Sequence, residues 1–384
     1  MTSGNQAILF LTSWYPVNTN PSHGIFIKNH ALALSRFQSV VVAYAYGCEN
    51  GPYYKVEHRN VNENFTEYIV RFPKSKGSLK MLSSFLNYRK AHKILIQHLL
   101  QKKIKVKAIQ VNVIFPATIA LNLYKRVFKV KHTIVEHWSG YLSDDSSYRG
   151  SILKYFTKKC IAGSSKIWYV SEWQKAAMNM AGLEGNYELL YNAVDTKLFA
   201  LKTYTPERIK LLHVSSLVEK EKNVSGTFNV IKKLQEANYD FDFVVAGGSG
   251  DELEQAKKLA AELKIKNIEF TGNVAPEKIS ELMQKSSALI LFSNYEGMPV
   301  VVLEALSCGL PVFASEAGQL SFYVREDFGA LVHKREEEEL FSALEKFIQK
   351  KYSFNGEAMR EFVLKHASYE AVGKQMNEFY KTFS

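Results

Sequence analysis

The chain has 384 residues, of which 49 are Lys or Arg and 38 are Asp or Glu, so its formal net charge is +11. This length predicts two domains of about 150 to 200 residues each. The content of 46% hydrophobic and 23% charged residues predicts a globular protein. The sequence contains no uninterrupted apolar run of about 18 residues, so no membrane-spanning helix is expected. The chain has no signal-peptide pattern and only three scattered cysteines, which favours a reduced, cytoplasmic protein.

Strand and helix patterns alternate through the first half of the chain and predict a parallel α/β sheet. Strands are expected at 7–11, 39–46, 108–115 and 132–137, with helices from about residue 24, over 79–102 and after residue 115. The lysine-rich segment 200–210 has the composition of a hinge linker.

A second alternating set follows this linker. Its strands are expected at 209–216, 241–248, 267–272 and 288–292, with helices from about residues 223, 251 and 276, and a final helix over 369–380. The pattern predicts two α/β domains, residues 1–199 and 200–365, followed by a helix within 366–384.

Residues 286–315 contain a strand, a turn and a helix in direct succession. The apolar residues 288–292 predict a buried strand, and the turn residues 293–297 follow it. Proline suits the first helical turn, so the helix should start near Pro299, and Gly309 should end it.

Two glutamates lie in this run. Glu296 falls in the predicted turn, and Glu304 falls inside the predicted helix, where the apolar residues of 300–306 surround it on nearly every face. A buried carboxylate without a partner would cost several kcal/mol. Glu304 therefore requires either a neighbouring cation or amide, or a bound ligand.

This run resembles the Glu-x7-Glu signature of the retaining glycosyltransferases of family 4, within the glycosyl transferases group 1. The resemblance covers nearly the whole chain and implies the GT-B fold, in which two Rossmann-like domains face each other across a cleft. It implies that Glu296 contacts the donor sugar and that Glu304 hydrogen-bonds the ribose hydroxyls of a sugar nucleotide. The helix N-terminus between them suits a diphosphate. The donor-binding residues implied there are Gly297, Met298, Pro299 and Val300.

The same resemblance assigns a role to each predicted domain. Residues 1–199 would mainly bind the acceptor, and residues 200–365 would mainly bind the sugar nucleotide. The C-terminal helix within 366–384 would pack back on the first domain.

Two residues of the first domain match family positions near the donor. Gly24 lies where the first loop enters its helix and resembles a glycine of a phosphate-approaching loop, although many members have two glycines there. A glycine at a helix start is also common without any function. His137 follows a predicted strand and matches a histidine that contacts the donor sugar. A neutral imidazole could bond a sugar hydroxyl, whereas a lone histidine is more often structural.

A diphosphate leaving group requires positive charge, from a metal ion or from fixed cations. Lys222 resembles the lysine that binds donor phosphates in the family, and Asn223 would cap the next helix. Lys220 is a competing assignment, because the loop is one residue longer than the common pattern. The family often carries an Arg slightly earlier, where this chain has Ser215 and Ser216.

Gly247 and Gly248 follow a predicted strand, and the resemblance places their turn in the nucleotide pocket, although the full dinucleotide fingerprint is absent. Asp240 and Asp242 form an Asp-x-Asp, a metal-binding pattern of the other major glycosyltransferase fold. They precede their strand, which puts them at the wrong edge of the sheet. No His or Cys cluster has metal-ligand spacing. The expected enzyme uses no metal and no cofactor.

Positive charge is concentrated in one part of the chain. Between Glu67 and Glu136 there are fifteen Lys and Arg and no acidic residue, whereas the remaining 34 Lys and Arg are outnumbered by 38 Asp and Glu. Segment 79–100 also has apolar residues at helical spacing, which predicts an amphipathic helix with a cationic face. Segment 71–107 is either solvated surface or a docking face for anionic lipid. Nucleic acid is not expected, because no RNA- or DNA-binding module is recognisable.

These features predict a retaining, metal-independent glycosyltransferase that moves a sugar from a nucleotide-diphosphate sugar to a glycan or lipid-linked acceptor. Surface polysaccharide synthesis is the expected setting, in the cytoplasm and at the inner face of the cell membrane. Lys222, Glu296 and His137 are the expected catalytic residues. Two alternatives stay open: a relative that isomerises or hydrolyses a nucleotide sugar, and a catalytically silent member that binds membranes or polyanions.

Overall fold

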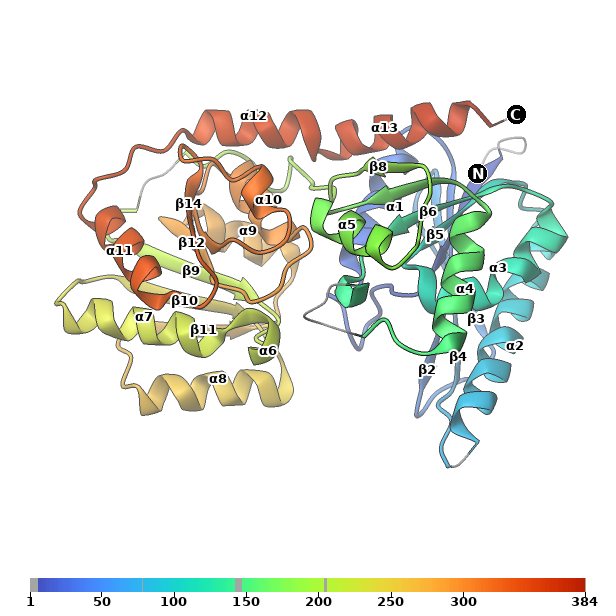
Figure 1. The fold of residues 1–384 in the computed structure, drawn as a ribbon, viewed down its shortest axis with the longest axis horizontal. Coiled ribbons are helices and arrows are strands. Elements are labelled where there is room, and N and C mark those ends of the chain that lie inside the picture. Colours follow the sequence, from blue (N-terminus) through green and yellow to red (C-terminus); the bar gives the residue numbers. More distant parts are fainter. Residues whose placement is uncertain (1–5, 78, 142–146, 204–205, 384) are drawn as a thin grey trace. The chain divides into compact units, whose positions relative to one another are not determined.

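The computed structural model describes residues 6–77, 79–141, 147–203 and 206–383. They form two compact units: unit 1 comprises Met1–Ala193 and Tyr369–Ser384, and unit 2 comprises Val194–Ser368 (Figure 1). Each unit has its own mostly parallel sheet with helices, which confirms the two predicted α/β domains. The boundary falls before the predicted linker, because Arg360 of unit 2 hydrogen-bonds the carbonyls of Thr196 and Phe199.

Unit 1 contains an eight-stranded sheet in the order β3-β4-β2-β1-β5-β6-β7-β8. Its strands are β1 (Ala7–Thr12), β2 (Val40–Cys48), β3 (Val56–Asn62), β4 (Phe65–Pro73), β5 (Val106–Asn112), β6 (His132–Glu136), β7 (Ser164–Tyr169) and β8 (Tyr187–Leu189). The edge strand β3 is antiparallel to β4, so this sheet is not wholly parallel as predicted. Strand β3 was not predicted because it is mostly exposed and polar.

Helices cover both faces of this sheet. One face packs on α1 (Ile25–Ser35) and α13 (Tyr369–Lys381). The other face packs on α2 (Lys80–Gln101), α3 (Ile114–Phe128), α4 (Ser151–Ala162) and α5 (Glu172–Met180). A short 3-10 helix, η1 (Ser139–Tyr141), follows β6. The central strands β1, β2 and β5 are buried on both faces, which is why they are nearly continuous apolar runs.

The predicted strand 108–115 is three residues too long at its C-terminal end. Strand β5 ends at Asn112, Val113 has a positive φ of 58°, and α3 starts at Ile114. Hydrophobicity alone could not reveal this turn, because Val113 and Ile114 are buried like the strand before them.

Unit 2 contains a six-stranded parallel sheet in the order β11-β10-β9-β12-β13-β14. Its strands are β9 (Lys210–Ser215), β10 (Asp242–Gly247), β11 (Ile268–Gly272), β12 (Ala288–Leu291), β13 (Val312–Ser315) and β14 (Gly329–Val332). The chain winds outward from β9 in one direction and from β12 in the other. The carboxyl ends of β9 and β12 therefore flank a topological switch point, where open α/β sheets bind ligands.

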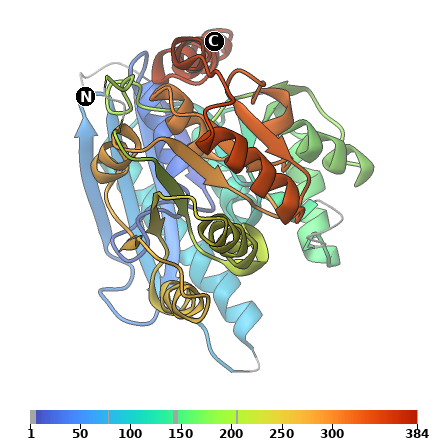
Figure 2. The same cartoon turned by 90° about the vertical axis from the view of Figure 1, so that its left-hand side faces the viewer.

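Helices also cover both faces of this second sheet. A shared core joins one face to α7 (Val224–Glu236), α8 (Gly250–Glu262) and α11 (Glu337–Ile348). Figure 2 shows α9 (Pro276–Gln284) and α10 (Val300–Ser307) on the opposite face. The remaining elements are α6 (Glu219–Lys222), η2 (Leu320–Phe322) and α12 (Gly356–His366). Among the described residues of both units, no helix is long and apolar enough to cross a membrane.

Candidate functional site

Lys222 and Glu296 meet at the switch point of unit 2. Lys222 ends α6, which follows β9, and Glu296 lies in the loop that follows β12. Because β9 and β12 are neighbours in the sheet, the two loops emerge side by side. Lys222 Nζ lies 2.8 Å from Glu296 Oε1, and the two side chains are only 17% and 7% exposed. The structure thus brings together two residues that the sequence predicts as separate parts of one site.

The loop that carries Glu296 is held by side chains that the sequence did not single out. Ser293 Oγ donates to Glu296 Oε1 over 2.7 Å. Asn294 donates from its backbone N–H to the carbonyl of Glu221 and from Nδ2 to the carbonyl of Lys220, over 2.8 and 3.1 Å. These bonds attach the loop to α6 and so set the distance between Lys222 and Glu296.

Two further contacts hold this loop from other strand ends. Arg335, after β14, donates from Nε to Asn294 Oδ1 over 3.0 Å. Gln319 N–H, after β13, donates to the carbonyl of Gly297 over 2.8 Å. Gly318 has a φ of +61°, and a Cβ there would lie 2.0 Å from the Glu296 carbonyl oxygen. Only glycine fits this approach, yet nothing in the local sequence indicates it.

The structure distinguishes Lys220 from Lys222, which the sequence left as competing assignments for the phosphate-binding lysine. Lys220 is exposed, and in the described residues only its backbone carbonyl takes part in holding the loop. Lys222 is the lysine that faces Glu296. Asn223 is the N-cap residue of α7, as predicted, but its side chain makes no capping hydrogen bond and its backbone is left-handed, with φ 48°. Ser225 instead bonds Glu219, which attaches α6 to the start of α7.

Glu304 lies on the open face of α10. Val300, Val301 and Glu304 are half-buried on this face, whereas Val302 and Leu303 are fully buried, so the prediction of burial on nearly every face is wrong. No group in the described ranges hydrogen-bonds or ion-pairs with the Glu304 carboxyl. Desolvation raises the pKa of this carboxyl to about 8. The sequence required a partner for it, and the described protein provides none.

The amino end of α10 is open as well. Pro299 is its N-cap residue, and no side chain of the described chain caps the helix. Helix N-terminal amides carry partial positive charge and commonly bind anions. Met298 is buried directly before this end, and Glu304 follows one turn along the helix. The chain between Glu296 and Glu304 therefore turns continuously into α10 through the predicted residues Gly297, Met298, Pro299 and Val300.

Gly247 and Gly248 end β10 and turn across the end of β9. Gly247 has a φ of +101°, and a Cβ there would lie 2.0 Å from the Ser215 carbonyl oxygen. These glycines are thus needed to bring the β10 turn against the β9 loop. The turn lies beside the strand that leads to Lys222, at the same edge of the sheet.

His213 is a buried polar residue within β9 that sequence reasoning missed. His213 Nδ1 lies 3.1 Å from the Ile290 carbonyl and Nε2 lies 2.8 Å from Ser215 Oγ, which also accepts from Leu217 N–H. Burial, together with the smaller effect of the nearby Lys222, lowers the pKa of His213 to about 4, although the hydrogen bond to Ile290 opposes this. The neutral ring therefore links β9 to β12 below the site. A polar side chain in an otherwise apolar predicted strand was the available signal.

Gly24 and His137 lie in unit 1, whereas the other predicted site residues lie in unit 2. Gly24 precedes α1 with a φ of +71°. The His137 ring packs on Phe26 with centroids 4.1 Å apart and lies 5.4 Å from the His30 ring. Burial holds the pKa of His137 well below its usual value, so the ring is neutral. Its Nε2 is buried without a hydrogen-bond partner among the described residues.

Glu136 fixes the turn that carries His137. Its carboxylate is fully buried and accepts from the backbone N–H groups of Ile114, His137 and Trp138 at 2.8 to 3.0 Å. Tyr141 donates a fourth bond, over 3.1 Å. Burial raises the pKa of Glu136 even though these bonds oppose the rise. Glu136 directly precedes His137 in the sequence, but its role as the centre of this turn became visible only in the structure.

Asp240 and Asp242 lie at the amino end of β10 and not at the edge that carries Lys222 and Glu296. Arg208 bridges both aspartates, at 2.5 and 3.4 Å. This agrees with the expectation of solvated residues at the start of a strand. Among the described residues, no three His, Cys, Asp or Glu side chains form a group that could hold a metal ion.

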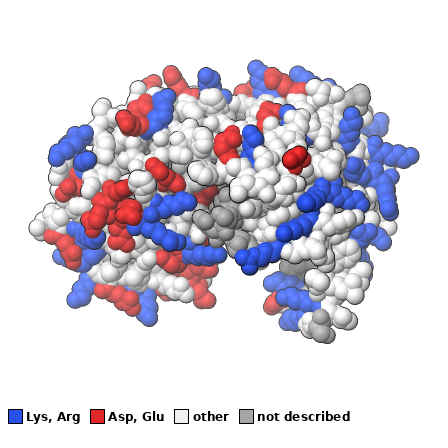
Figure 3. All heavy atoms as spheres, in the orientation of Figure 1, with Lys and Arg blue, Asp and Glu red and all other residues white. Residues whose placement is uncertain are grey.

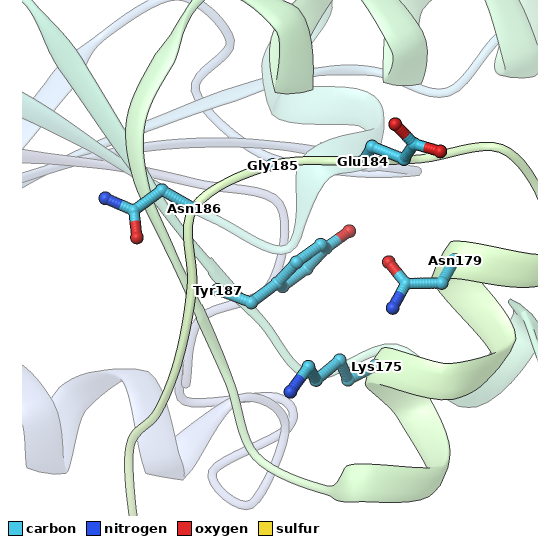
Figure 4. Close-up of a pocket in the computed structure, with 6 residues that line it drawn as sticks. All are labelled: Lys175, Asn179, Glu184, Gly185, Asn186 and Tyr187. Carbon is cyan, nitrogen blue, oxygen red and sulfur yellow. The ribbon is translucent and has the colours of Figure 1, made fainter.

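An open hollow of about 670 Å³ lies in unit 1 between α5 and β8 (Figure 4). It is lined by Lys175, Asn179, Glu184, Gly185, Asn186 and Tyr187. Figure 4 shows the side chains of Asn179 and Tyr187 directed toward each other across it. None of these residues was predicted as functional, and none belongs to the switch-point site of unit 2.

Residues 198–363, nearly all of unit 2, match the family model of the glycosyl transferases group 1. Unit 2 is therefore a domain of the glycosyl transferases group 1. Lys222, Glu296 and Glu304 all lie within the matched residues.

Two relatives extend the similarity beyond unit 2. This glycosyltransferase is 25% identical over 272 residues to an uncharacterized glycosyltransferase of Methanocaldococcus jannaschii, covering 70% of this chain and 69% of the relative. It is 21% identical over 364 residues to a Bacillus subtilis glycosyltransferase provisionally named for teichuronic acid biosynthesis, covering 88% of each chain.

Solved structures match the whole fold. The sucrose-phosphate synthase of Thermosynechococcus elongatus has a TM-score of 0.78 and 16% identity, covering 98% of each chain. The Anabaena protein HepE, solved in complex with UDP and glucose, has a TM-score of 0.72 and 15% identity, covering 98% of this chain and 100% of that one. The glycosyltransferase has the GT-B fold.

The Lys222–Glu296 pair should be energetically coupled. We expect a coupling free energy above about 1.5 kcal/mol in a double-mutant cycle of Lys222→Ala and Glu296→Ala, because removing one partner leaves the other charge buried. The matched control is Glu254–Lys257 on α8, an exposed pair at 2.9 Å, where about 0.5 kcal/mol or less is expected. Urea unfolding measures both cycles. Equal coupling in the two pairs would contradict the buried pair.

Glu304 should lower the stability of unit 2 as the pH rises. Its folded pKa of about 8 lies above the ordinary value of 4.5, so the folded state holds a proton that the unfolded chain releases between these values. The free energy of unfolding therefore falls as the pH rises through that window, and Glu304→Gln removes the loss. We expect the variant to gain about 2 °C or more in Tm at pH 9 and little at pH 5, by calorimetry. A gain independent of pH would contradict the raised pKa.

Proposed function

We propose that this chain is a retaining, metal-independent glycosyltransferase that transfers a sugar from a nucleoside-diphosphate sugar to a glycan or lipid-linked acceptor. One observation carries the proposal. The half-buried Lys222–Glu296 pair lies at the switch point, with the uncapped end of α10 and the unpartnered Glu304 following along the same turn. A cation, open helix amides and a free carboxyl are the groups that a phosphate and a ribose require.

Each group then has a role in donor binding. Glu304, which has no partner among the described residues, accepts hydrogen bonds from the ribose hydroxyls. The amides at the start of α10 face the diphosphate, and Lys222 supplies a full positive charge beside it. Glu296 uses Oε1 for Lys222 and Ser293. Its second oxygen remains for a sugar hydroxyl.

The transfer step follows from the charge that develops on the leaving group. The bond from the anomeric carbon to the diphosphate oxygen breaks, and a bond to the acceptor hydroxyl oxygen forms on the same face of the sugar. The acceptor's proton passes to an oxygen of the departing diphosphate. Lys222 and the α10 amides stabilise that diphosphate as its negative charge grows, so fixed protein charges do the work of a metal ion.

The class of acceptor and the cellular location are proposed from the names of similar proteins. The Bacillus subtilis relative is named for teichuronic acid, and HepE is named with UDP and glucose. We therefore propose a surface polysaccharide or its lipid-linked precursor as the acceptor, bound mainly by unit 1, and UDP as the first nucleotide to test. Gly24 and the neutral His137, both in unit 1, are proposed as further donor-binding residues. The basic segment 71–107 would hold the enzyme at an anionic membrane surface on the cytoplasmic side.

Lys222 and Glu304 should affect different parts of the donor. In titrations with UDP, GDP, ADP, CMP, dTDP and the corresponding nucleotide sugars, saturation at about 100 times Kd should stabilise the protein by about 2.7 kcal/mol. We expect Lys222→Ala to weaken the nucleoside diphosphate about tenfold or more, and to lower kcat/KM about 10²- to 10³-fold. Glu304→Ala should also weaken nucleoside monophosphates, because it loses the ribose. The matched control is Lys220→Ala, expected within about twofold of wild type.

If no nucleotide stabilises the protein, or if Lys220→Ala acts like Lys222→Ala, the assignment of this site fails. Turnover of the nucleotide sugar without any acceptor would instead favour a hydrolase or isomerase on the same fold.

The product should keep the anomeric configuration of the donor. With the donor that binds, proton NMR of the first product formed distinguishes the two anomers, and retention is expected because attack and departure occur on one face. Activity should be unchanged after dialysis against EDTA, since Lys222 and the helix amides carry the leaving-group charge. An inverted product contradicts the mechanism. Loss of activity that Mg²⁺ or Mn²⁺ restores contradicts metal independence.

A further inference from the structure

The amino-terminal half of α2 projects beyond the core of unit 1. The helix spans Lys80–Gln101, but its buried residues begin only at Tyr88 and continue through Leu99. None of residues 80–87 is fully buried. Figure 1 shows this amino end of α2 at the lower extremity of unit 1, past the ends of β2 and β4. The helix therefore has an inner half with fully buried side chains and an outer half that is mostly exposed, in which Phe85 is only partly buried against the core.

Large apolar side chains are exposed on and beside this outer half. Leu79 is 69% exposed, Met81 74%, Leu82 55% and Leu86 56%. The apolar residues of the inner half, such as Leu95 and Leu99, are buried in the core. The predicted amphipathic helix of segment 79–100 thus has two different halves, and its exposed large apolar side chains gather on and beside the outer half, with Leu100 at the opposite end as the exception among the described residues.

The surroundings of this outer half are cationic. Lys74, Lys76, Lys80 and Lys93 are exposed, and α2 contains no acidic residue. Within the described residues, Lys74, Lys76 and Lys80 have no ion pair. Figure 3 shows Lys and Arg atoms beside uncharged atoms at this end of unit 1. Exposed leucines with exposed lysines close by in the sequence match a surface with an apolar interior and an anionic face, which is that of an anionic lipid bilayer.

We propose that the outer half of α2 inserts Leu79, Met81, Leu82 and Leu86 into the acyl boundary of an anionic membrane, while the neighbouring lysines contact the headgroups. This inference deepens the proposed function, in which a lipid-linked acceptor would be reached at the membrane. It differs from adsorption of the whole basic segment, because the apolar side chains contribute as well as the charge. A second copy of the chain is a poor occupant, since two such cationic surfaces repel each other.

The test is sedimentation of the full chain with vesicles. Wild type should bind vesicles of phosphatidylcholine with phosphatidylglycerol and bind pure phosphatidylcholine weakly.

The double variant Leu82→Ser/Leu86→Ser should bind the anionic vesicles about tenfold or more weakly, since each leucine loses its transfer free energy. Lys74→Gln/Lys76→Gln/Lys80→Gln should lose binding mainly at low salt. The matched control is Leu100→Ser, a 50% exposed leucine at the other end of the same helix, expected to bind like wild type.

A second measurement reports insertion directly. Tryptophan emission from Leu86→Trp should shift to shorter wavelength with anionic vesicles, and that from Leu100→Trp should not. The inference is overturned if Leu82→Ser/Leu86→Ser binds like wild type, if high salt removes all binding, or if the chain binds RNA or heparin but no vesicle. Nucleotide-induced stabilisation in the same variants separates this failure from failure of the proposed function, because Leu82 and Leu86 belong to unit 1 and the switch-point site belongs to unit 2.

Discussion

The half-buried ion pair of Lys222 and Glu296 is the interaction on which the candidate site depends. Removing two opposite charges from water costs several kcal/mol per ion, so neither side chain would be stable in this position without the other. The neighbouring elements supply what the pair needs: adjacent strands bring the loops together, Asn294 attaches one loop to the other, and Ser293 satisfies the carboxylate further. In the proposed enzyme, an incoming diphosphate would change this balance, because Lys222 would gain a second anionic partner while Glu296 keeps Ser293. In the proposed enzyme the empty site is thus held ready by the same charges that later bind the donor.

Glu304 avoids the cost of a desolvated charge by protonation and not by an ion pair. Its carboxyl has no partner in the described protein, and desolvation raises its pKa to about 8, so the proton and not a cation removes the charge near neutral pH. A site that keeps such a group gives up some stability, which is expected where a residue serves a ligand and not the fold. The contrast with Glu136 supports this view. That carboxylate is also buried, but four donors satisfy it, and its role is to hold a turn.

In unit 1, positive charge and exposed apolar side chains gather along one helix, α2. Its excess of positive charge is not spread evenly but accompanies α2, whose inner half completes the core and whose outer half touches the core mainly through the partly buried Phe85. Packing explains the apolar residues of the inner half, since Leu95 and Leu99 bury their side chains in the core. It does not explain leucines that remain exposed at the tip. Neutral His137, enclosed by Phe26 and His30, is the corresponding candidate group at the strand ends of unit 1.

The sequence by itself determined the class of fold and the main candidates of the site. Strands buried on both faces must be continuous apolar runs, so strand and helix alternation was visible, and the spacing of Glu296 and Glu304 within a strand-turn-helix segment was local information. Lys222 could be named but not distinguished from Lys220, because the choice depends on which side chain reaches a loop 74 residues away. The edge strand β3 and the outer half of α2 were missed or misjudged for one physical reason: burial is decided by neighbours distant in the chain. Asn294 and Gly318 became meaningful only when the tertiary structure brought other strand ends against the Glu296 loop, since hydrogen bonds and close backbone approaches between loops leave no periodic pattern in the sequence.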